Sequence, residues 1–145
     1  MTGAEAAPGH RFERESPIRF AHCDPAGIVF FPQYLVMFNG LVEDWVTEGL
    51  GVPYASLIGV RLIGLPTVGL QCDFSAISRM GERVTLGLSV ARLGHSSIHL
   101  QLACRCGSEE RVHAKQVLVT TDLRTHRSIP VPPDLREAMA GFLLP

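Results

Sequence analysis

Apolar residues between Pro32 and Gly49 recur at the spacing of one helix face. Four stand at i, i+4, i+7 and i+11, and three more lie beside them, which makes a broad stripe. The stripe consists of Tyr34, Leu35, Phe38, Leu41, Val42, Trp45 and Val46. Pro32 suits the first helical position because its missing N–H would have no partner there, and Gly49 is a stop signal. The pattern predicts one long helix over 32–49, which the rest of the chain surrounds.

From Pro66 onward the apolar period changes to two, the period of half-buried strands. Short Gly-containing turns between the alternating runs favour an antiparallel meander. Consecutive apolar residues at 117–119 are typical of a strand covered on both faces. A further early run completes the sheet. The predicted strands are 12–20, 68–76, 84–91, 98–104 and 112–121.

The elements form one unit, because no internal repeat or interdomain linker is visible. Short helices are predicted at 54–58 and around 135–142. A long helix and an antiparallel sheet predict an α+β layer arrangement in a single domain over 1–145, with the helix on one face of the sheet. Residues 1–15 are rich in Ala, Gly and charge and are expected to be a flexible extension. They contain no apolar segment of the kind that marks a secretory signal.

Composition narrows the class of protein. A hydrophobic content of 46% with 19% charged residues is typical of a folded domain, and the formal net charge is −1. The sequence has no basic stripe with interleaved aromatics, so nucleic acid is not expected as a partner. The apolar runs are too short to span a bilayer.

Three of the four cysteines, at 72, 104 and 106, lie in apolar runs and are expected to be buried thiols of a cytoplasmic protein. Zinc bound by Cys104, Cys106 and a histidine is the alternative.

The segment before the long helix carries the candidate chemistry. Residues 24–27 (Asp-Pro-Ala-Gly) have turn chemistry, and residues 28–31 are wholly apolar. Free backbone N–H groups and the positive end of the helix dipole are expected at 31–34, where they suit a polarised carbonyl oxygen. Asp24 lies on a turn that can fold back over this end. A carboxylate beside such donors is a plausible pair for acyl transfer.

The amino-acid sequence of this segment resembles that of a known family. It reads Phe20-x-x-Cys23-Asp24-Pro25-Ala26-Gly27-Ile28-Val29-Phe30-Phe31-Pro32-x-Tyr34, and it is similar to the active-site segment of hot-dog-fold acyl-CoA thioesterases of the 4-hydroxybenzoyl-CoA thioesterase type. The resemblance extends from about Ser16 to Pro133. It implies a sheet wrapped around the long helix, Asp24 as the catalytic carboxylate and the Phe31 N–H as the oxyanion donor. It also implies a homodimer or homotetramer with the site between subunits, and no metal or redox cofactor.

Each residue of the segment also has a plainer interpretation. Asp24 can simply organise an Asx-turn, and as a catalytic group it can be nucleophile or general base. His22 stands where related proteins have an acidic residue, and it either tunes Asp24 or caps the turn. Phe30 and Phe31 either line an acyl pocket or belong to the core.

Candidate substrate contacts lie further along the chain. Asp73 shares a strand face with Gln71 and Ser75, which either touches substrate or is solvated. Arg127 resembles the family's nucleotide-contacting arginine before an Ile-x-Val-Pro sequence, and the alternative is a solvated loop residue. The family's basic loop between the second and third meander strands is less basic here, which leaves three candidates for the coenzyme A phosphates: Arg92, Ser96 and Ser97.

The sequence therefore predicts a thioesterase that hydrolyses an aromatic (4-hydroxybenzoyl-like) or short acyl-CoA to the free acid and coenzyme A. One alternative is a hot-dog hydratase or dehydratase, which would pair a carboxylate with a histidine, and only His22 is close in sequence to Asp24. The other is a non-catalytic domain that binds acyl-CoA as a sensor.

Overall fold

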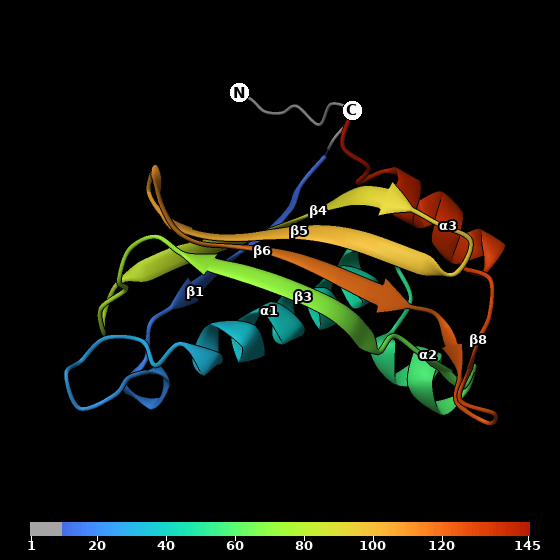
Figure 1. Cartoon of the computed structure of the whole chain (residues 1–145), viewed down its shortest axis with the longest axis horizontal. Coiled ribbons are helices and arrows are strands. Elements are labelled where there is room, and N and C mark those ends of the chain that lie inside the picture. Colours follow the sequence, from blue (N-terminus) through green and yellow to red (C-terminus); the bar gives the residue numbers. More distant parts are fainter. Residues whose placement is uncertain (1–9) are drawn as a thin grey trace.

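The computed structural model describes residues 10–145 (Figure 1). Five antiparallel strands form the main sheet, in the order β1-β4-β5-β6-β3. Their bounds are β1 Phe12–Pro17, β3 Thr67–Phe74, β4 Arg83–Leu93, β5 Ser97–Cys106 and β6 Glu109–Val119. The long helix α1 spans Pro32–Asp44 and continues as a π-helical turn over Trp45–Gly49. The predicted helix over 32–49 is confirmed.

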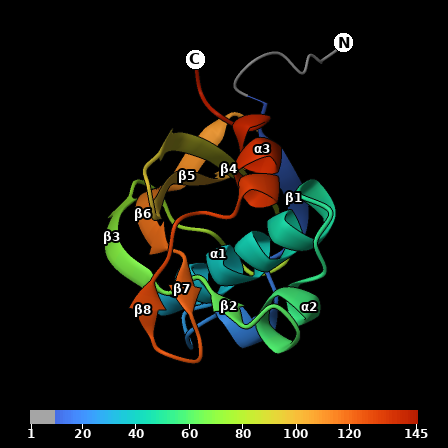
Figure 2. The ribbon, with the colours of Figure 1, turned by 90° about the vertical axis from the view of Figure 1, so that its right-hand side faces the viewer.

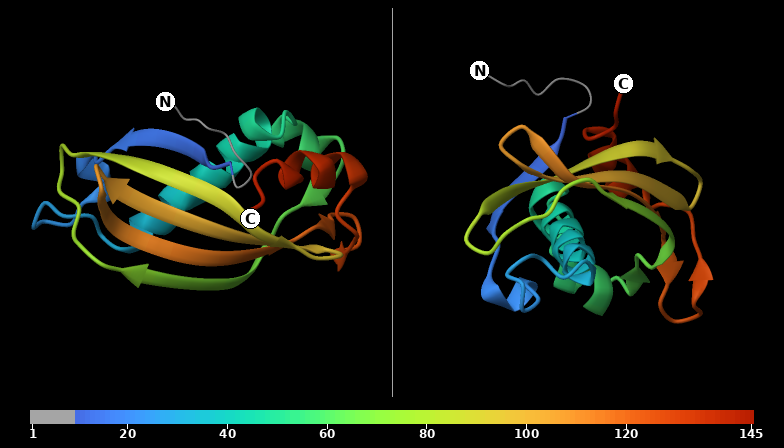
Figure 3. Two further views of the ribbon diagram at one scale, coloured as in Figure 1. Left: turned by 90° about the horizontal axis from the view of Figure 1, so that it is seen from above. Right: turned by 60° about the vertical axis from the view of Figure 1, so that its left-hand side comes forward.

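The sheet curves around α1, which lies within its concave face (Figures 2 and 3). This is the arrangement that the resemblance predicts, and the α+β class with a hot-dog architecture is confirmed. The face of α1 toward the sheet carries seven buried residues at helical spacing. They are Tyr34, Met37, Phe38, Leu41, Val42, Trp45 and Val46. Each such side chain contributes roughly 1.5–3 kcal/mol by leaving water, so α1 is the centre of the core.

Shorter elements close the two ends of the core. The predicted turn of helix at 54–58 is α2 (Tyr54–Gly59), and the predicted terminal helix is α3 (Pro133–Ala140). A small second sheet, which the alternation did not predict, joins β2 (Ile63–Gly64), β7 (Thr121–Asp122) and β8 (Arg127–Ser128). It extends the end of the molecule opposite the start of α1 (Figure 1).

The position of β3 corrects the sequence prediction. A simple meander would place β3 beside β4, but β3 pairs with β6 at the far edge of the sheet. None of its residues is buried, and its apolar Val68 is 63% exposed. Alternation reports that a strand has two unlike faces, but it carries no information on which strand is its neighbour or whether a face is covered.

The N-terminal and cysteine predictions hold only in part. The first strand already begins at Phe12, so the flexible extension predicted over 1–15 does not reach Glu15; residues 1–9 lie outside the described residues. All four cysteines are free thiols, but only Cys104 is buried, and the others are half-buried. In the described part of the chain, no helix has both the length and the apolar character needed to cross a membrane.

Candidate active site

The loop between Asp24 and Phe31 is a compact, hydrogen-bonded turn. The Asp24 Oδ1 accepts the Ala26 N–H at 2.8 Å, the Asp24 carbonyl accepts the Gly27 N–H at 2.9 Å, and the Asp24 N–H donates to the Ile28 carbonyl at 3.0 Å. Gly27 has a φ of 78°, which favours glycine. The interpretation of Asp24 as the residue that organises an Asx-turn is therefore confirmed. Among residues 10–145, no further hydrogen bond reaches the carboxylate, so Oδ2 is available for chemistry.

The start of α1 offers one free backbone donor rather than the four positions expected. Pro32 has no N–H, the Gln33 N–H donates to the Phe30 carbonyl at 2.8 Å, and the Tyr34 N–H donates to the Phe31 carbonyl at 3.1 Å. The Phe31 N–H donates to no backbone acceptor in the described chain. An oxyanion at this end would therefore bind the Phe31 N–H, strengthened by the helix dipole.

His22 forms hydrogen bonds at the two ends of the segment before α1. Its Nδ1 accepts the Arg19 N–H at 2.9 Å, and its carbonyl accepts the Phe30 N–H at 2.9 Å. Burial and the positive charge of Arg19 lower the pKa of His22. These bonds favour the capping interpretation, because they tie the imidazole to its own 3₁₀ turn, Phe20–His22.

Residues 75–82, which connect β3 to β4, form backbone hydrogen bonds to the loop that holds Asp24. The Val29 N–H donates to the Ser78 carbonyl, and the Met80 N–H donates to the Gly27 carbonyl, both at 3.0 Å. Ile28 and Arg79 form an isolated antiparallel bridge. The position of Asp24 and Phe31 therefore depends on how firmly residues 75–82 are held.

A buried arginine on β6 holds this connection. Arg111 is only 6% exposed, and its Nη1 donates to the Ile77 carbonyl at 2.8 Å, to the Ser78 Oγ at 3.2 Å and to the Glu82 Oε1 at 2.8 Å. Its Nε donates to Glu109 at 2.5 Å. The guanidinium lowers the pKa of Glu82 to about 2, mainly by donating hydrogen bonds to it. The carboxylates in turn raise the pKa of Arg111.

Sequence reasoning did not find Arg111 or Glu82. Arg111 follows two glutamates in a polar turn, a pattern typical of a solvated face. Only the register of β6 against the connection 29 residues earlier buries it. No local signal reports such a long-range pair.

Aromatic side chains surround the start of α1. Phe30 and Phe31 are 51% and 57% exposed, so their core interpretation is wrong. Their rings meet edge to face at 5.6 Å between centroids; Phe31 meets Phe74 of β3 at 5.9 Å, and Phe74 meets Tyr34 at 5.9 Å. These four residues form an aromatic wall between α1 and the edge strand.

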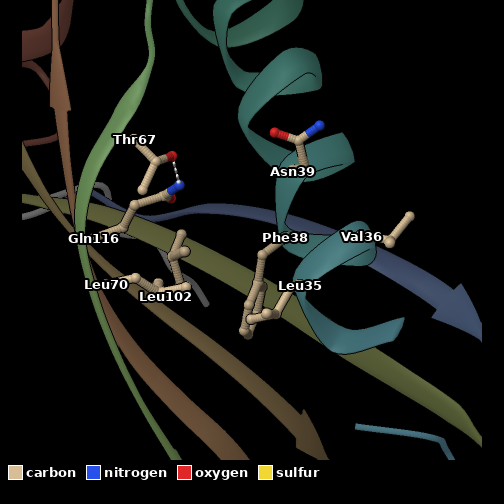
Figure 4. Close-up of a pocket in the computed structure, with 8 residues that line it drawn as sticks. All are labelled: Leu35, Val36, Phe38, Asn39, Thr67, Leu70, Leu102 and Gln116. Atoms are coloured by element: carbon tan, nitrogen blue, oxygen red, sulfur yellow. Dashed lines mark hydrogen bonds between the residues drawn. The ribbon is translucent and has the colours of Figure 1, made fainter. Parts of the chain in front are cut away.

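A cavity continues from this wall along the groove between α1 and β3 (Figure 4). Its volume is about 360 Å³, within the range of small-molecule sites. It is lined by Leu35, Val36, Phe38, Asn39, Thr67, Leu70, Leu102 and Gln116. Leu35 is one helical turn beyond Phe31, so the cavity starts close to the free Phe31 N–H.

The structure does not bring Asp73 to this groove. Leu70 and Phe74 of β3 face α1. Because side chains alternate along a strand, Asp73 points to the opposite face, where it is exposed.

The predicted nucleotide contacts gather at the other end of the sheet. The Val131 N–H donates to the His95 carbonyl and the Thr120 N–H donates to the Ser96 carbonyl, each at 2.9 Å. These bonds place the segment after Arg127 against the β4–β5 hairpin with Arg92, Ser96 and Ser97. The Arg92 Nη2 and Ser97 Oγ meet the His99 Nε2 at 3.0 and 3.3 Å.

Within one chain, these contacts are far from Asp24. Strand β4 starts beside the loop that holds Asp24, just after Glu82, and ends at Leu93 after 11 residues, a length of roughly 35 Å. Figure 1 shows the start of α1, which follows this loop, and strand β8 at opposite ends of the molecule. The site predicted from the sequence is therefore divided between two distant places.

Comparisons with known proteins show similarity to thioesterases. The sequence profile of the thioesterase-like superfamily matches residues 18–139. The chain is 32% identical over 82 residues to the 1,4-dihydroxy-2-naphthoyl-CoA hydrolase of Synechocystis sp., a match that covers 56% of the chain and only 58% of that relative. It is 24% identical over 129 residues to the hydrolase of the same name from Synechococcus elongatus, covering 88% of the chain and 93% of the relative.

The fold has close counterparts among solved structures. A gentisyl-coenzyme A thioesterase superposes with a TM-score of 0.80 at 26% identity, covering 88% of this chain and 99% of that chain.

Proposed function

The chain belongs to the thioesterase-like superfamily, and we propose that this thioester hydrolase acts on aromatic or short acyl-CoA thioesters with Asp24 as its catalytic carboxylate. The observation that carries the proposal is that one hydrogen-bonded loop holds both an available Asp24 oxygen and the free Phe31 N–H at the start of α1. Binding alone would need neither group. The resemblance of the active-site segment supports the further proposal that the chain belongs to the 4-hydroxybenzoyl-CoA branch.

The two groups account for the steps of hydrolysis. The thioester carbonyl oxygen accepts the Phe31 N–H, so that negative charge developing on it in the transition state is stabilised. Asp24 either attacks the carbonyl carbon, giving a mixed anhydride that water then opens, or takes a proton from an attacking water. In both routes the C–S bond breaks, coenzyme A leaves as a thiolate that takes up a proton, and the acid is released. This chemistry uses only a carboxylate, a backbone donor and water.

Aromatic walls favour a flat acyl group. Phe30, Phe31, Phe74 and Tyr34 offer edge and face contacts to a ring, worth about 1 kcal/mol beyond the buried area. The relatives named above act on 1,4-dihydroxy-2-naphthoyl-CoA and gentisyl-CoA, both aromatic. The cavity of about 360 Å³ suits such a group better than a long chain.

A homodimer would reunite the divided site. Among the described residues, the exposed edge strand β3 pairs with β6 alone, and open edges of this kind are usually covered. Antiparallel pairing of two β3 strands places the Phe74 end of one copy beside the Thr67 end of the other. The Asp24 end of each copy then lies near the Arg127 end of its partner. A cytoplasmic location, consistent with the free cysteines, completes the proposal.

A thiol-release assay tests the reaction. Side-by-side rates on benzoyl-, 4-hydroxybenzoyl-, hexanoyl- and palmitoyl-CoA should show the lowest kcat/KM for palmitoyl-CoA. A clear palmitoyl preference would contradict the aromatic or short acyl group. Binding of acyl-CoA without release of thiol would favour the sensor alternative, and hydration of an enoyl-CoA would favour the hydratase.

Mixing two variants tests the shared site. If Asp24 of one copy works with Arg127 of the other, a heterodimer of Asp24→Asn and Arg127→Ala contains one site with both residues intact. At low substrate concentration, where the loss of Arg127 matters most, the mixture should exceed the activity expected from the separate variants. An unchanged, additive activity, or light scattering that shows an active monomer, would contradict the dimer.

A further inference from the structure

Three large apolar side chains are exposed on the turns around Asp24. Phe20 is 77% exposed, Met80 is 52% exposed and Ile77 is 47% exposed. Phe20 begins the 3₁₀ turn before the loop that holds Asp24, and the other two belong to the connection between β3 and β4. Large apolar groups that gather on a protein surface usually mark a site that binds a partner or a membrane. We call these three residues the apolar tip.

The apolar tip is one place in the fold, although its residues come from two segments. The Met80 N–H donates to the Gly27 carbonyl at 3.0 Å. The Gly81 N–H donates to the Ile18 carbonyl at 2.9 Å, and Ile18 is two residues before Phe20. These bonds fasten the connection between β3 and β4 to the turns before α1. Figure 1 shows the blue loop before α1 projecting from one end of the molecule, and Figure 3 shows the same projection from above.

Each segment of the apolar tip also carries an arginine. Arg19 stands directly before Phe20, and Arg79 stands directly before Met80. Both arginines are exposed, and neither forms an ion pair with another of residues 10–145. The carboxylate of Asp24 is half-buried in its own turn. The charges that flank the apolar tip in sequence are therefore both positive, without an ion-pair partner in the described chain.

The shape of this end favours a lipid surface as the occupant. A side chain as exposed as Phe20, on a projecting turn, is covered on all sides only by a partner that surrounds it. A bilayer interface is fluid and closes around inserted side chains, whereas a folded protein covers them only where it offers a matching pocket. Guanidinium groups bind phosphate oxygens, and anionic headgroups attract basic residues near the bilayer. Arginines beside exposed apolar residues therefore suit an anionic lipid surface.

We propose that the apolar tip docks on an anionic membrane surface, with its side chains among the headgroups and with Arg19 and Arg79 at the lipid phosphates. Such binding is peripheral and reversible. It goes beyond the proposed function, because it concerns the surface on which the chain acts rather than the bond that it hydrolyses. The Phe30 N–H donates to the carbonyl of His22, in the turn that Phe20 begins. The aromatic wall would therefore lie beside the membrane surface.

Co-sedimentation with vesicles tests the docking directly. Wild-type protein is mixed at low ionic strength with vesicles of phosphatidylglycerol and phosphatidylcholine in equal parts, and separately with vesicles of phosphatidylcholine alone. The affinity for the anionic vesicles should be higher by about tenfold or more, because two arginines meet lipid phosphates. This difference should shrink at high salt. Binding to neither kind of vesicle, or equal binding to both, would overturn the proposal.

Two variants and a matched control locate the contact. Phe20→Ser and Met80→Ser should each weaken binding to the anionic vesicles about fivefold or more, since each removes apolar area that leaves water on docking. Val60→Ser should bind as the wild type does. Val60 is 76% exposed but follows α2, at the end of the molecule opposite the start of α1 (Figure 1). Unchanged binding by both tip variants, or an equal loss in Val60→Ser, would contradict the proposal.

The arginines are tested separately from the apolar residues. A double variant with Arg19→Gln and Arg79→Gln should lose most of the preference for anionic over neutral vesicles. Arg124→Gln, at another exposed arginine without an ion-pair partner among residues 10–145, should keep this preference. A double variant that keeps the full preference would show that other groups meet the lipid, and the proposal would fail.

Light scattering without lipid distinguishes a second copy of the chain from a membrane as the occupant. Wild type and Phe20→Ser should have the same oligomeric state, and a change of state in Phe20→Ser would overturn the proposal. None of these measurements uses turnover. A chain that binds anionic vesicles but hydrolyses no acyl-CoA keeps this inference and loses the proposed function, and an active enzyme that binds no vesicle does the reverse.

Discussion

The two ends of the sheet are built in opposite ways. At the end that holds Asp24, the loop is fixed by backbone hydrogen bonds to residues 75–82, and the buried guanidinium of Arg111 fixes that connection in turn. At the other end, Arg92 and Arg127 are exposed, and neither forms an ion pair with another residue of 10–145. One end is held by hydrogen bonds and a buried arginine, and the other carries exposed arginines without an ion-pair partner among the described residues.

The difference matches two different tasks. A group that attacks a carbonyl must be placed in advance, since a displacement of about 1 Å can cost on the order of a hundredfold in rate. A phosphate needs positive charge nearby, and exposed cations supply it with little dependence on exact position. Mutations at the first end should therefore lower kcat, and mutations at the second should raise KM.

The largest effect is expected for Asp24→Asn. The substitution removes the attacking or proton-accepting oxygen at nearly constant volume, so kcat should fall by at least about a hundredfold. The amide oxygen can still accept the Ala26 N–H, so the loop should remain folded. Thiol release by a purified sample with an unchanged thermal unfolding curve checks this. Near-normal turnover in such a sample would falsify the assignment of Asp24.

Arg111→Met should damage the rigid end without touching substrate. It removes the guanidinium that donates to Glu82 and to the Ile77 carbonyl, so that Glu82 keeps only the Arg79 N–H, and breaking such a pair should cost about 3 kcal/mol of stability. Below the lowered unfolding temperature, kcat should still fall about tenfold with little change in KM, because the loop is less firmly placed.

The control for Arg111 is a strand arginine with an exposed partner. Arg105 donates to Glu13 at 3.0 Å, and loss of an exposed pair costs less than about 1 kcal/mol. Arg105→Met should leave kcat unchanged. If both variants lose the same stability and kcat is normal in both, Arg111 is a structural residue with no role in positioning the loop.

A smaller effect is expected at the open end. Arg127→Ala should raise KM several-fold and weaken the salt dependence of KM, with a smaller change in kcat, if Arg127 contacts a coenzyme A phosphate. Rates at low and high ionic strength measure this. An unchanged KM at low ionic strength would return Arg127 to the interpretation as a solvated loop residue.

The smallest effect is a pH dependence of stability at the rigid end. Arg111 lowers the pKa of Glu82 from 4.5 to about 2, so the folded state binds a proton less readily than the unfolded state. The stabilisation is present above pH 4.5 and is lost as the pH falls toward 2. Melting temperatures of wild type and Glu82→Gln should differ most near pH 7 and converge in acid. Glu15→Gln, whose Arg83 pair is exposed, should show almost no gap at any pH.

What the sequence predicted depends on how local each signal is. Helix α1 was predictable because its apolar residues repeat at one spacing within 18 positions. The turn that holds Asp24 was predictable because its residues stand in a short segment with turn and helix-start chemistry, whereas the catalytic roles of Asp24 and Phe31 stay predictions. The place of β3 was not, because strand order is set by pairing between distant segments. Arg111 and Gln116 were missed for the same reason, since each is buried by residues far away in sequence.

The open edge of β3 also has a consequence for how the chain survives in a cell. Without a second copy to cover it, the strand presents unpaired backbone groups beside exposed Val68 and Leu70, which is the template from which cross-β aggregates grow. If the chain dimerises as proposed, assembly of newly made subunits competes with aggregation through this edge. Substitutions that weaken the proposed dimer are then expected to lower the yield of soluble protein before they show any change in an isolated catalytic step.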